Sequence, residues 1–506
     1  MNLRTIRLAI ALSALASLPL AAQLPSTPPG AAGFDPHRLE VLHRTMRGLV
    51  DEGKQAGIVW LIARDGKIVD FEAAGWRDLE HKLPMQKDTI CRVYSMSKLV
   101  TSVATLVLLE EGKVLLDDPV GDHLPELKAM KVMTGGTAET PQLVDTRRPV
   151  TIKHLLTHTS GLIYDFDGTD ALHQLYQRAD LWSGTSLKDF TAKVARLPLR
   201  HQPGEDWSYG INCDILGALV ERASGQPFEA FLRDRIFGPL GMKDTSFDVP
   251  AGKRARLART YRHDPAGKLV EAEPMLGTWP EAGRGLASGG AGLFSTAGDY
   301  ARFAQMLLNG GELEGRRILG RKTVEFMTAN HLTALPRPRH AYNPAMGFGL
   351  GVEVRMEQGQ ATCLGSVGQF GWYGAATTYC QIDPQERIVA IALAQHFPFN
   401  QHKLFERFAN GCFQALTDQG AATAVEPAGG RTAASTPKPT GRAAPALTSG
   451  GPFGPAGGIG LARLAPALRR PIVVRAPLAG GILAHHGRVR VDRPAGVAQL
   501  DRASAF

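Results

Sequence analysis

Apolar residues recur at helical spacing near the start of the chain and then follow the pattern of strands. The segment 36–53 places its apolar positions three or four residues apart, which predicts an amphipathic helix. The runs 58–63 and 68–73 are strand-like and flank Asp65 and Gly66, a pair typical of a tight hairpin turn. The chain therefore opens with a helix and a β-hairpin.

The middle of the chain is predicted to be helical and its end to be a sheet. A buried helix follows Lys98 and stops at Gly112, a polar loop covers 135–149, and Thr296 with Asp299 opens a later helix through a capping box. The other predicted helices are 184–196, 214–224 and 402–417, and the predicted antiparallel strands are 352–356, 361–365, 375–382 and 388–394.

These elements indicate an α+β fold with an antiparallel sheet built from both chain ends, flanked by helices, plus a mainly helical insert. The insert would form the second wall of a cleft. Residues 1–22 have a charged start, a short apolar run and small residues at the end, which predicts a signal peptide and a periplasmic or secreted protein. Residues 23–34 form a linker, 35–418 the folded domain, and 419–506 a low-complexity basic tail expected to be disordered.

The formal charge of +9 belongs mainly to that tail. Residues 421–506 carry 11 Lys and Arg against three Asp and Glu, so the folded domain is close to neutral. We therefore predict neither a nucleic-acid partner nor a membrane-spanning segment after removal of the signal peptide. The composition leaves the oligomeric state open.

The five cysteines lie far apart and form no Cys-x-x-Cys pair. This spacing indicates neither a zinc site nor a dense disulfide framework, and we predict no metal and no cofactor. We expect most of the cysteines to be buried, and their odd number leaves at least one free thiol.

Candidate chemistry begins with Ser95 and Lys98, which stand at the start of the predicted buried helix. The free amides of a helix start favour an oxyanion, and a lysine three residues later returns to the same face. A lysine in apolar surroundings tends to lose its proton and can then activate a serine. A second Ser-x-x-Lys begins at Ser435, but Pro437 forbids a helix there.

Two other motifs are read as structural. His158 invites comparison with a Ser-His-Asp triad, but the chain contains no Gly-x-Ser-x-Gly elbow, so we interpret it as a histidine that stabilises a turn. The glycine-rich run 289–292 lacks the Lys-Ser/Thr of a phosphate loop and is interpreted as a close-packed turn.

Six motifs follow one another along the chain: SMSK at 95, HLLTHTSGL at 154, PGEDWSYG at 203, PLGM at 239, SGGAGLFSTAGDYARFAQML at 288 and GQFGWYGAATTY at 368. In this order, over about residues 35–415, they resemble the serine β-lactamase and penicillin-binding-protein superfamily, closest to class C β-lactamases and family VIII carboxylesterases. The resemblance implies that residues 35–418 are a serine hydrolase domain that needs no cofactor.

The resemblance also implies roles for single residues. Ser95 would be the acylated nucleophile, Lys98 its proton partner, and Tyr209 the tyrosine that shares general-base work with Lys98 and protonates the leaving group. The backbone amides of Ser95 and Ala375 would form the oxyanion hole.

The chain departs from β-lactamases at two places that bind substrate. Ile211 stands where they have an asparagine that holds the lactam side chain. Trp372, Tyr373 and Gly374 replace their Lys-Thr-Gly, so the cation for the lactam carboxylate is missing and an aromatic wall stands instead. We also expect Gly371 and Gly374 to leave room for substrate along a strand edge.

We therefore predict an exported serine carboxylesterase that acts on short-chain or neutral esters through an acyl-enzyme. Its partner would be a small-molecule ester or amide. The alternatives are a class C-like β-lactamase or a D-alanyl-D-alanine carboxypeptidase and, from a different class, a non-catalytic binding module on the same fold.

Overall fold

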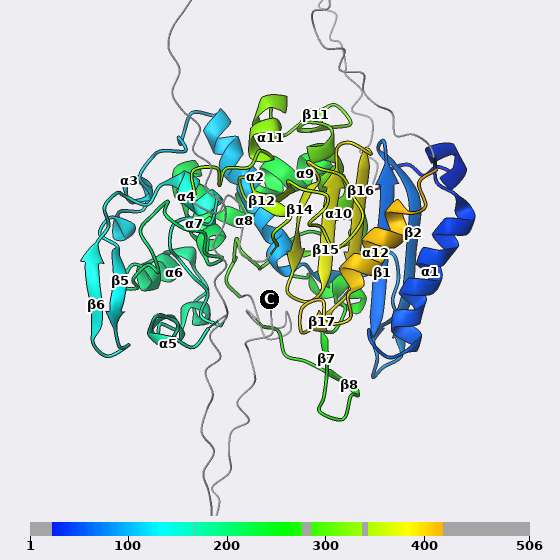
Figure 1. Ribbon diagram of the computed structural model, residues 1–506, viewed down its shortest axis with the longest axis horizontal. Coiled ribbons are helices and arrows are strands. Elements are labelled where there is room, and N and C mark those ends of the chain that lie inside the picture. The colour runs from blue at the N-terminus through cyan, green and yellow to red at the C-terminus, as the bar shows by residue number, and fades with distance from the viewer. Residues whose placement is uncertain (1–22, 167, 276–284, 336–342, 418–506) are drawn as a thin grey trace, which may run out of the picture. The chain divides into compact units, whose positions relative to one another are not determined.

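The computed structural model describes residues 23–166, 168–275, 285–335 and 343–417. The predicted signal peptide and tail lie outside these residues. An eight-stranded antiparallel sheet has the order β12-β13-β14-β15-β16-β1-β2-β3 and joins strands from both ends of the domain, as predicted (Figure 1). Its strands are β1 (Gly57–Arg64), β2 (Lys67–Asp78), β3 (Leu83–Pro84), β12 (Met346–Phe348), β13 (Glu353–Arg355), β14 (Phe370–Gly374), β15 (Thr378–Asp383) and β16 (Ile388–Leu393).

Helices cover both faces of this sheet, and they also form most of the region beside the sheet, which is built from the middle of the chain (Figure 1). They are α1 (Pro36–Asp51), α2 (Ser97–Glu110), α3 (Val120–His123), α4 (Ile152–Leu156), α5 (Ala171–Arg178), α6 (Leu187–Val194), α7 (Asn212–Ser224), α8 (Phe228–Leu232), α9 (Gly238–Leu240), α10 (Ala297–Leu308), α11 (Arg321–Met327) and α12 (Leu404–Phe413). No helix within the described ranges is long and apolar enough to cross a membrane.

Shorter strands tie loops to this frame. They are β4 (Cys91–Arg92), β5 (Lys131–Gly136), β6 (Pro141–Asp145), β7 (Tyr261–His263), β8 (Leu269–Glu271), β9 (Phe294–Ser295), β10 (Glu312–Leu313), β11 (Arg316–Arg317) and β17 (His396–Phe397). All five cysteines are free thiols, and four of them are buried.

Strand β1 shows why the sheet lies at the centre of the domain. All of its residues are buried, and alternate side chains enter different cores. Ile58, Trp60 and Ile62 pack in the core that includes α1 and α12, whereas Val59 and Leu61 join the larger core on the α2 and α10 face. The strand is therefore apolar on both faces instead of alternating with polar residues.

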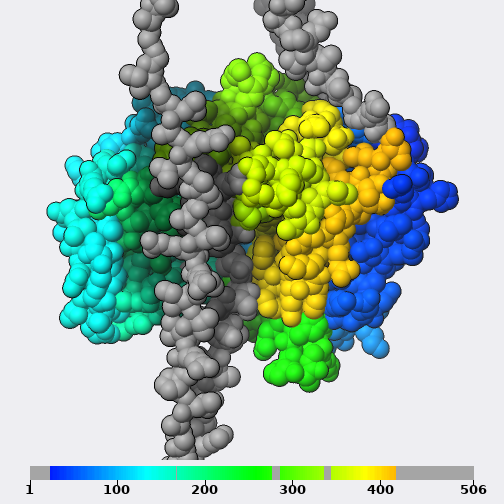
Figure 2. Space-filling view, viewed as in Figure 1, coloured from blue at the N-terminus to red at the C-terminus, as the bar shows by residue number. Residues whose placement is uncertain are grey.

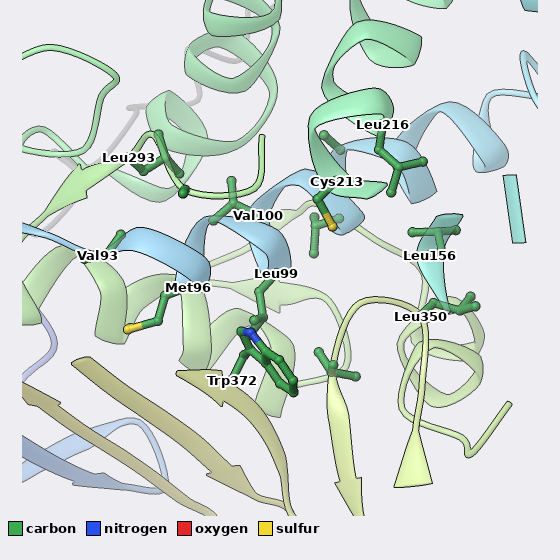
Figure 3. Close-up of a cluster of buried hydrophobic side chains, with 14 of the residues drawn as sticks. Val93, Met96, Leu99, Val100, Leu156, Cys213, Leu216, Leu293, Leu350 and Trp372 are labelled. Atoms are coloured by element: carbon green, nitrogen blue, oxygen red, sulfur yellow. The ribbon is translucent and has the colours of Figure 1, made fainter. Parts of the chain in front are cut away.

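The nucleophile helix is also buried on every side, as its largely apolar sequence predicts. Every residue from 97 to 108 of α2 is buried. Figure 3 shows its side chains together with residues of the helical half and of the sheet. The residues labelled there are Val93, Met96, Leu99, Val100, Leu156, Cys213, Leu216, Leu293, Leu350 and Trp372. The start of α2 is thus fixed by packing from both halves.

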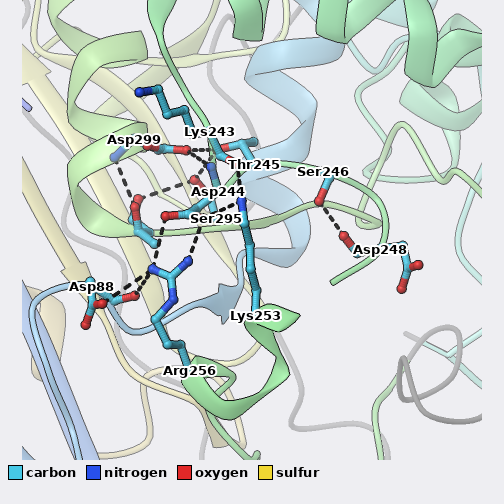
Figure 4. Close-up of polar contacts among 11 residues, drawn as sticks. Asp88, Lys243, Asp244, Thr245, Ser246, Asp248, Lys253, Arg256, Ser295 and Asp299 are labelled. Atoms are coloured by element: carbon cyan, nitrogen blue, oxygen red, sulfur yellow. Dashed lines mark hydrogen bonds and ion pairs between the residues drawn. The ribbon is translucent and has the colours of Figure 1, made fainter. Parts of the chain in front are cut away.

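A polar cluster, shown in Figure 4, contacts the β4–β9 strand pair, which precedes the start of α2. Asp244 forms ion pairs with Arg256 at 2.6 Å and Lys253 at 2.8 Å, and its backbone amide donates to Asp299 Oδ2 at 2.7 Å. Thr245 Oγ1 bonds to both Asp299 and Ser295, and Ser295 in β9 pairs with Cys91 in β4. Strand β4 ends three residues before Ser95, so the cluster helps to fix the segment that carries the nucleophile.

Three predictions of local structure are wrong. Residues 135–149 are not simply a polar loop, because residues 131–145 form the exposed β5–β6 hairpin, whose polar strands carry no buried alternating pattern. No strand occupies 361–365, and β14 begins instead at Phe370. Thr296 caps α10, but the Asp299 side chain points to Asp244 and Thr245 and does not complete a capping box.

Candidate active site

Ser95 lies in a single 3₁₀ turn, 94–96, immediately before α2. Tyr94, the residue before it, has a φ of 44°, a left-handed conformation that is strained for a bulky side chain. The hydroxyl of Tyr300 donates to the Met96 carbonyl at 2.8 Å, and the Leu293 amide donates to Ser97 Oγ at 3.1 Å. The turn that presents Ser95 is therefore fixed on both sides.

Lys98 meets Ser95 on the same face of the helix. Its Nζ donates to Ser95 Oγ at 3.0 Å, to the Tyr164 hydroxyl at 2.8 Å and to the Gly290 carbonyl at 2.9 Å. The side chain is 1% exposed, and burial lowers the pKa of the Lys98 ammonium to about 8. A substantial fraction of Lys98 is thus neutral near physiological pH and able to take a proton from Ser95.

Tyr164 is the member of this group that the sequence analysis did not single out. It follows the Gly161 turn in the segment that begins at His158, two residues beyond the quoted motif. Its ring is buried and stacks on Phe166 with centroids 4.7 Å apart. An aromatic residue directly after the motif was the only sequence signal, because its contact with Lys98 arises from tertiary folding.

Tyr209 approaches Lys98 by its ring. Lys98 Nζ lies 4.6 Å from the Tyr209 ring centroid, and the Tyr209 hydroxyl accepts a hydrogen bond from Trp372 Nε1 at 3.0 Å. A cation over an aromatic face is favoured by the ring quadrupole. The structure therefore brings Ser95 and the Tyr209 ring to the Lys98 ammonium, and Trp372 to the Tyr209 hydroxyl, all four residues named from the sequence.

His158 links the two loops that carry the tyrosines. Its φ is 55°, its Nδ1 accepts from Asn212 Nδ2 at 2.8 Å, and its backbone carbonyl accepts from the Ser208 amide at 2.9 Å. The ring lies 4.9 Å from that of Tyr209. These contacts confirm that His158 stabilises a turn.

The glycine-rich run 289–292 is a close-packed turn, as expected. A Cβ at Gly289 would lie 2.3 Å from the Cys213 carbonyl, and one at Gly290 would lie 2.5 Å from Asp214 Oδ2. Asp214 Oδ1 accepts from the Gly290 amide at 3.1 Å, and burial raises the pKa of the Asp214 carboxyl. The turn serves to aim the Gly290 carbonyl at Lys98.

The end of β14 packs against the segment that leads into Ser95. Thr378 Oγ1 donates to the Val93 carbonyl at 3.2 Å, and a Cβ at Gly374 would stand 2.3 Å from that carbonyl oxygen. A Cβ at Gly371 would lie 2.1 Å from the Cys380 carbonyl. Backbone packing therefore requires both glycines, and their role in leaving room for substrate stays a prediction. Ala375, the next residue after Gly374, is buried beside this contact.

A cavity of about 310 Å³ adjoins this group of residues. Tyr209 and Trp372 belong to both, and Tyr373, Met346, Phe399 and Phe405 contribute further apolar wall; Ser95 and Ile211 do not line it. Most residues of the cavity wall belong to the yellow to orange part of the chain, one face of which is visible in Figure 2. Ile211 is fully buried next to the first turn of α7, so the structure does not bring it to the cavity.

The charged residues of the cavity wall are Glu353, Arg355 and Glu406. Arg355 is 4% exposed, and its guanidinium donates to the Cys363 carbonyl at 3.0 Å and to Gln358 Oε1 at 3.2 Å. Among the described residues of the wall, Arg355 is the one cation, and its guanidinium is already bound to protein acceptors, with two carboxylates nearby. Within the described ranges, one group of side chains could hold a metal ion, and it lies outside this site.

Comparison with known proteins agrees with this geometry. The family model described as Beta-lactamase matches residues 42–415. Protein Rv1367c of Mycobacterium tuberculosis is 35% identical over 362 residues, which cover 70% of this chain and 89% of that protein. Esterase EstB of Burkholderia gladioli is 35% identical over 272 residues, 50% of this chain and 65% of the esterase.

A solved structure shares the same architecture. EstCE1, described as a hydrolase with promiscuous acyltransferase activity, superposes with a TM-score of 0.64 and 26% identity. The match covers 74% of this chain and 99% of that protein.

Proposed function

Because the chain belongs to the beta-lactamase family, we propose that it is a serine carboxylesterase that acts on neutral esters through an acyl-enzyme on Ser95. The observation that carries the proposal is the 3.0 Å contact between Lys98 Nζ and Ser95 Oγ, made by a lysine whose pKa burial lowers to about 8. A serine needs such a base before it can attack a carbonyl. The similarity to Esterase EstB supports the same reaction class.

In the first half of the reaction, neutral Lys98 takes the proton of Ser95 Oγ as the oxygen bonds to the ester carbonyl carbon. The negative charge on the carbonyl oxygen is stabilised by the backbone amides of Ser95 and Ala375. Support for this pair comes from the packing of Gly374 and Thr378 on Val93, which places the two segments side by side. The C–O bond of the ester then breaks, and the alcohol leaves with one proton.

We assign delivery of that proton to Tyr209, because its hydroxyl belongs to a residue of the cavity wall. Lys98, over the ring of Tyr209, replaces the proton. Water then attacks the acyl-enzyme with the same groups acting in reverse, which releases the carboxylic acid and restores Ser95. Tyr164, buried away from the cavity, is assigned a positioning role on Lys98.

The charge of the cavity wall favours an uncharged substrate. A β-lactam brings a carboxylate, and moving it out of water without a free cation costs several kcal/mol. Here Arg355 is already bound to the Cys363 carbonyl, while Glu353 and Glu406 would repel an anion. A short ester needs only an apolar wall and the oxyanion hole, which Trp372 and Tyr373 with the two amides would supply.

The test compares p-nitrophenyl butyrate with a chromogenic cephalosporin on the same protein. We expect kcat/KM for the ester to exceed that for the cephalosporin by at least ~100-fold, about 2.7 kcal/mol of transition-state binding. The Ser95→Ala variant provides the background rate for each compound. Equal or better turnover of the cephalosporin would overturn the esterase assignment in favour of the β-lactamase or D-alanyl-D-alanine carboxypeptidase alternative.

Labelling by a fluorophosphonate separates all of these enzymes from a non-catalytic module. Wild type should be labelled on Ser95, and absence of labelling would favour the binding module. We further propose that the enzyme works outside the cytoplasm, which rests on the sequence of residues 1–22 alone.

A further inference from the structure

Three histidines from separate parts of the chain meet at one end of the large sheet. His263 ends β7, His396 begins β17, and His402 stands two residues before α12. Strands β7 and β17 pair in parallel and lie together below the large sheet in Figure 1. One ring nitrogen from each histidine lies within 4.8 Å of the other two, and the ring centroids are 5.0 to 5.3 Å apart.

Hydrogen bonds fix which nitrogen of His263 faces its neighbours. Its Nε2 lies 3.0 Å from the Gly53 carbonyl oxygen, which can only accept, so Nε2 carries the hydrogen and Nδ1 keeps a lone pair. That Nδ1 faces His396 Nε2 at 3.0 Å. A backbone carbonyl that accepts from the outer nitrogen is the usual means of orienting a metal-binding histidine.

The third histidine, His402, has a buried ring nitrogen, Nε2, that makes no hydrogen bond with the described residues. Leaving a buried polar atom without a hydrogen-bond partner is unfavourable. A cation at the centre of the three rings would bind His402 Nε2. It would also bind His263 Nδ1 and His396 Nε2, which now share one hydrogen.

Only the neutral form of a histidine ring binds a metal ion. Two cationic side chains, Lys54 and Arg407, lie near His402. Lys54 is paired with Glu52, and Arg407 Nε donates to the His402 carbonyl at 3.3 Å.

We propose that His263, His396 and His402 form a binding site for Zn²⁺, with water as the fourth ligand. Three imidazoles suit this ion, whereas Ca²⁺ and Mg²⁺ require oxygen ligands that the cluster lacks. Tetrahedral Zn²⁺ with Zn–N bonds of 2.0–2.1 Å separates its ligand nitrogens by about 3.3 Å. His263 Nδ1 and His396 Nε2 are 3.0 Å apart, and the three ligand nitrogens all lie within 4.8 Å of one another, which is compatible with this spacing.

The site would act as a structural clasp. The His396 amide donates to the Ala376 carbonyl at 3.0 Å, and Thr377 Oγ1 donates to the His396 carbonyl at 2.9 Å. These two residues directly follow Ala375, whose amide we assign to the oxyanion hole. Bound metal would therefore join β7, β17 and the start of α12 and stiffen the turn after β14, without entering the ester chemistry.

The experiment uses the untagged full-length protein, stripped with a chelator and titrated with Zn²⁺ and separately with Co²⁺. We expect one equivalent bound per chain, a rise in Tm, and the visible absorption of tetrahedral cobalt. His402→Ala should abolish the cobalt spectrum and weaken Zn²⁺ binding at least ~100-fold, the upper range for losing a mere outer-shell partner. His331→Ala, a half-buried histidine elsewhere, is the matched control and should bind like wild type.

Two results would overturn the site: no stoichiometric metal in wild type, or unchanged binding in His402→Ala. Should His402→Ala fail to fold, His263→Gln provides the same comparison at a half-buried position. Metal stoichiometry and the cobalt spectrum do not depend on ester hydrolysis, so the outcome is independent of the proposed function.

Discussion

Two tyrosines reach Lys98 from two different loops, and they make two different kinds of contact. Tyr164 presents its hydroxyl, 2.8 Å from Nζ, whereas Tyr209 presents its ring, with the centroid 4.6 Å away. Tyr164 is enclosed by Phe166 and Trp182, with centroids 4.7 and 6.3 Å from its own. Tyr209 instead lines the cavity. One tyrosine is therefore placed to hold the lysine and the other to meet the substrate.

The two tyrosines divide between them the contacts that a single tyrosine would otherwise make with Lys98 and the cavity. A hydrogen bond from an ammonium to a hydroxyl stabilises the charged lysine and fixes its position. A ring face also stabilises the cation, and the hydroxyl of the same tyrosine can then bond to another group, here Trp372 Nε1. We therefore expect the loss of the two hydroxyls to have unequal effects, both smaller than loss of the nucleophile.

Removal of the nucleophile should cause the largest loss of activity among the variants considered. Ser95→Ala should lower kcat for p-nitrophenyl butyrate by about 10⁶-fold, the cost of losing the serine in a serine hydrolase. It should also abolish fluorophosphonate labelling while the circular dichroism spectrum is unchanged. Ser435→Ala, in the second Ser-x-x-Lys, should alter neither activity nor labelling. Retention of most activity by Ser95→Ala would refute the whole catalytic assignment.

Loss of the cavity-facing hydroxyl should have the next largest effect. Tyr209→Phe keeps the ring near Lys98 but removes the proton donor for the leaving group, so kcat should fall about 10²–10³-fold with KM little changed. Tyr176→Phe is the matched control, because Tyr176 is also buried and donates to the Pro198 carbonyl at 3.1 Å. If both variants lost activity equally, the assignment of proton delivery to Tyr209 would fail.

Trp372 should matter through Tyr209. Trp372→Phe keeps an aromatic wall but removes the indole donor that aims the Tyr209 hydroxyl, and we expect kcat/KM to fall about 5–10-fold, the value of one hydrogen bond. A double-mutant cycle measures the coupling. In the Tyr209→Phe background the tryptophan substitution should have almost no further effect, and a full additional loss would show that Trp372 acts on the substrate directly.

The sequence predicted features whose pattern is local and buried. The Asp65–Gly66 hairpin has positive φ at both residues, and α2 is largely apolar, so each could be recognised without its neighbours. The sheet from both chain ends is confirmed by the pairing of β1 with β16. The exposed β5–β6 hairpin was missed because its strands bury no alternating face.

In the candidate site, too, the sequence predicts only contacts between residues that are close along the chain. Ser95 and Lys98 are three residues apart on one helix, so their contact follows from helical geometry. Tyr164 and the three histidines have no such spacing, since His263 and His396 are 133 residues apart. Their proximity depends on how β7, β17 and the loops pack, which neither periodicity nor a short motif encodes.

Removal of the Tyr164 hydroxyl should have the smallest effect on activity. The measurement that detects it best is the pH dependence of kcat/KM. Burial lowers the pKa of Lys98 to about 8, so the neutral base increases as pH rises, and kcat/KM should climb with an apparent pKa of about 8 to a plateau above it. The Tyr164 oxygen accepts from Lys98 and so favours the ammonium.

In Tyr164→Phe the ammonium loses that acceptor, and its pKa should fall further, which moves the acidic limb of the profile to lower pH. The plateau rate should fall only about 5-fold, the net value of one hydrogen bond, because Lys98 also donates to the Gly290 carbonyl and Ser95 Oγ. Tyr209→Phe should lower the plateau without this displacement, since its ring contact remains. A profile displaced by Tyr209→Phe and not by Tyr164→Phe would reverse the two assignments, because the hydroxyl that stabilises the ammonium would then belong to the cavity wall.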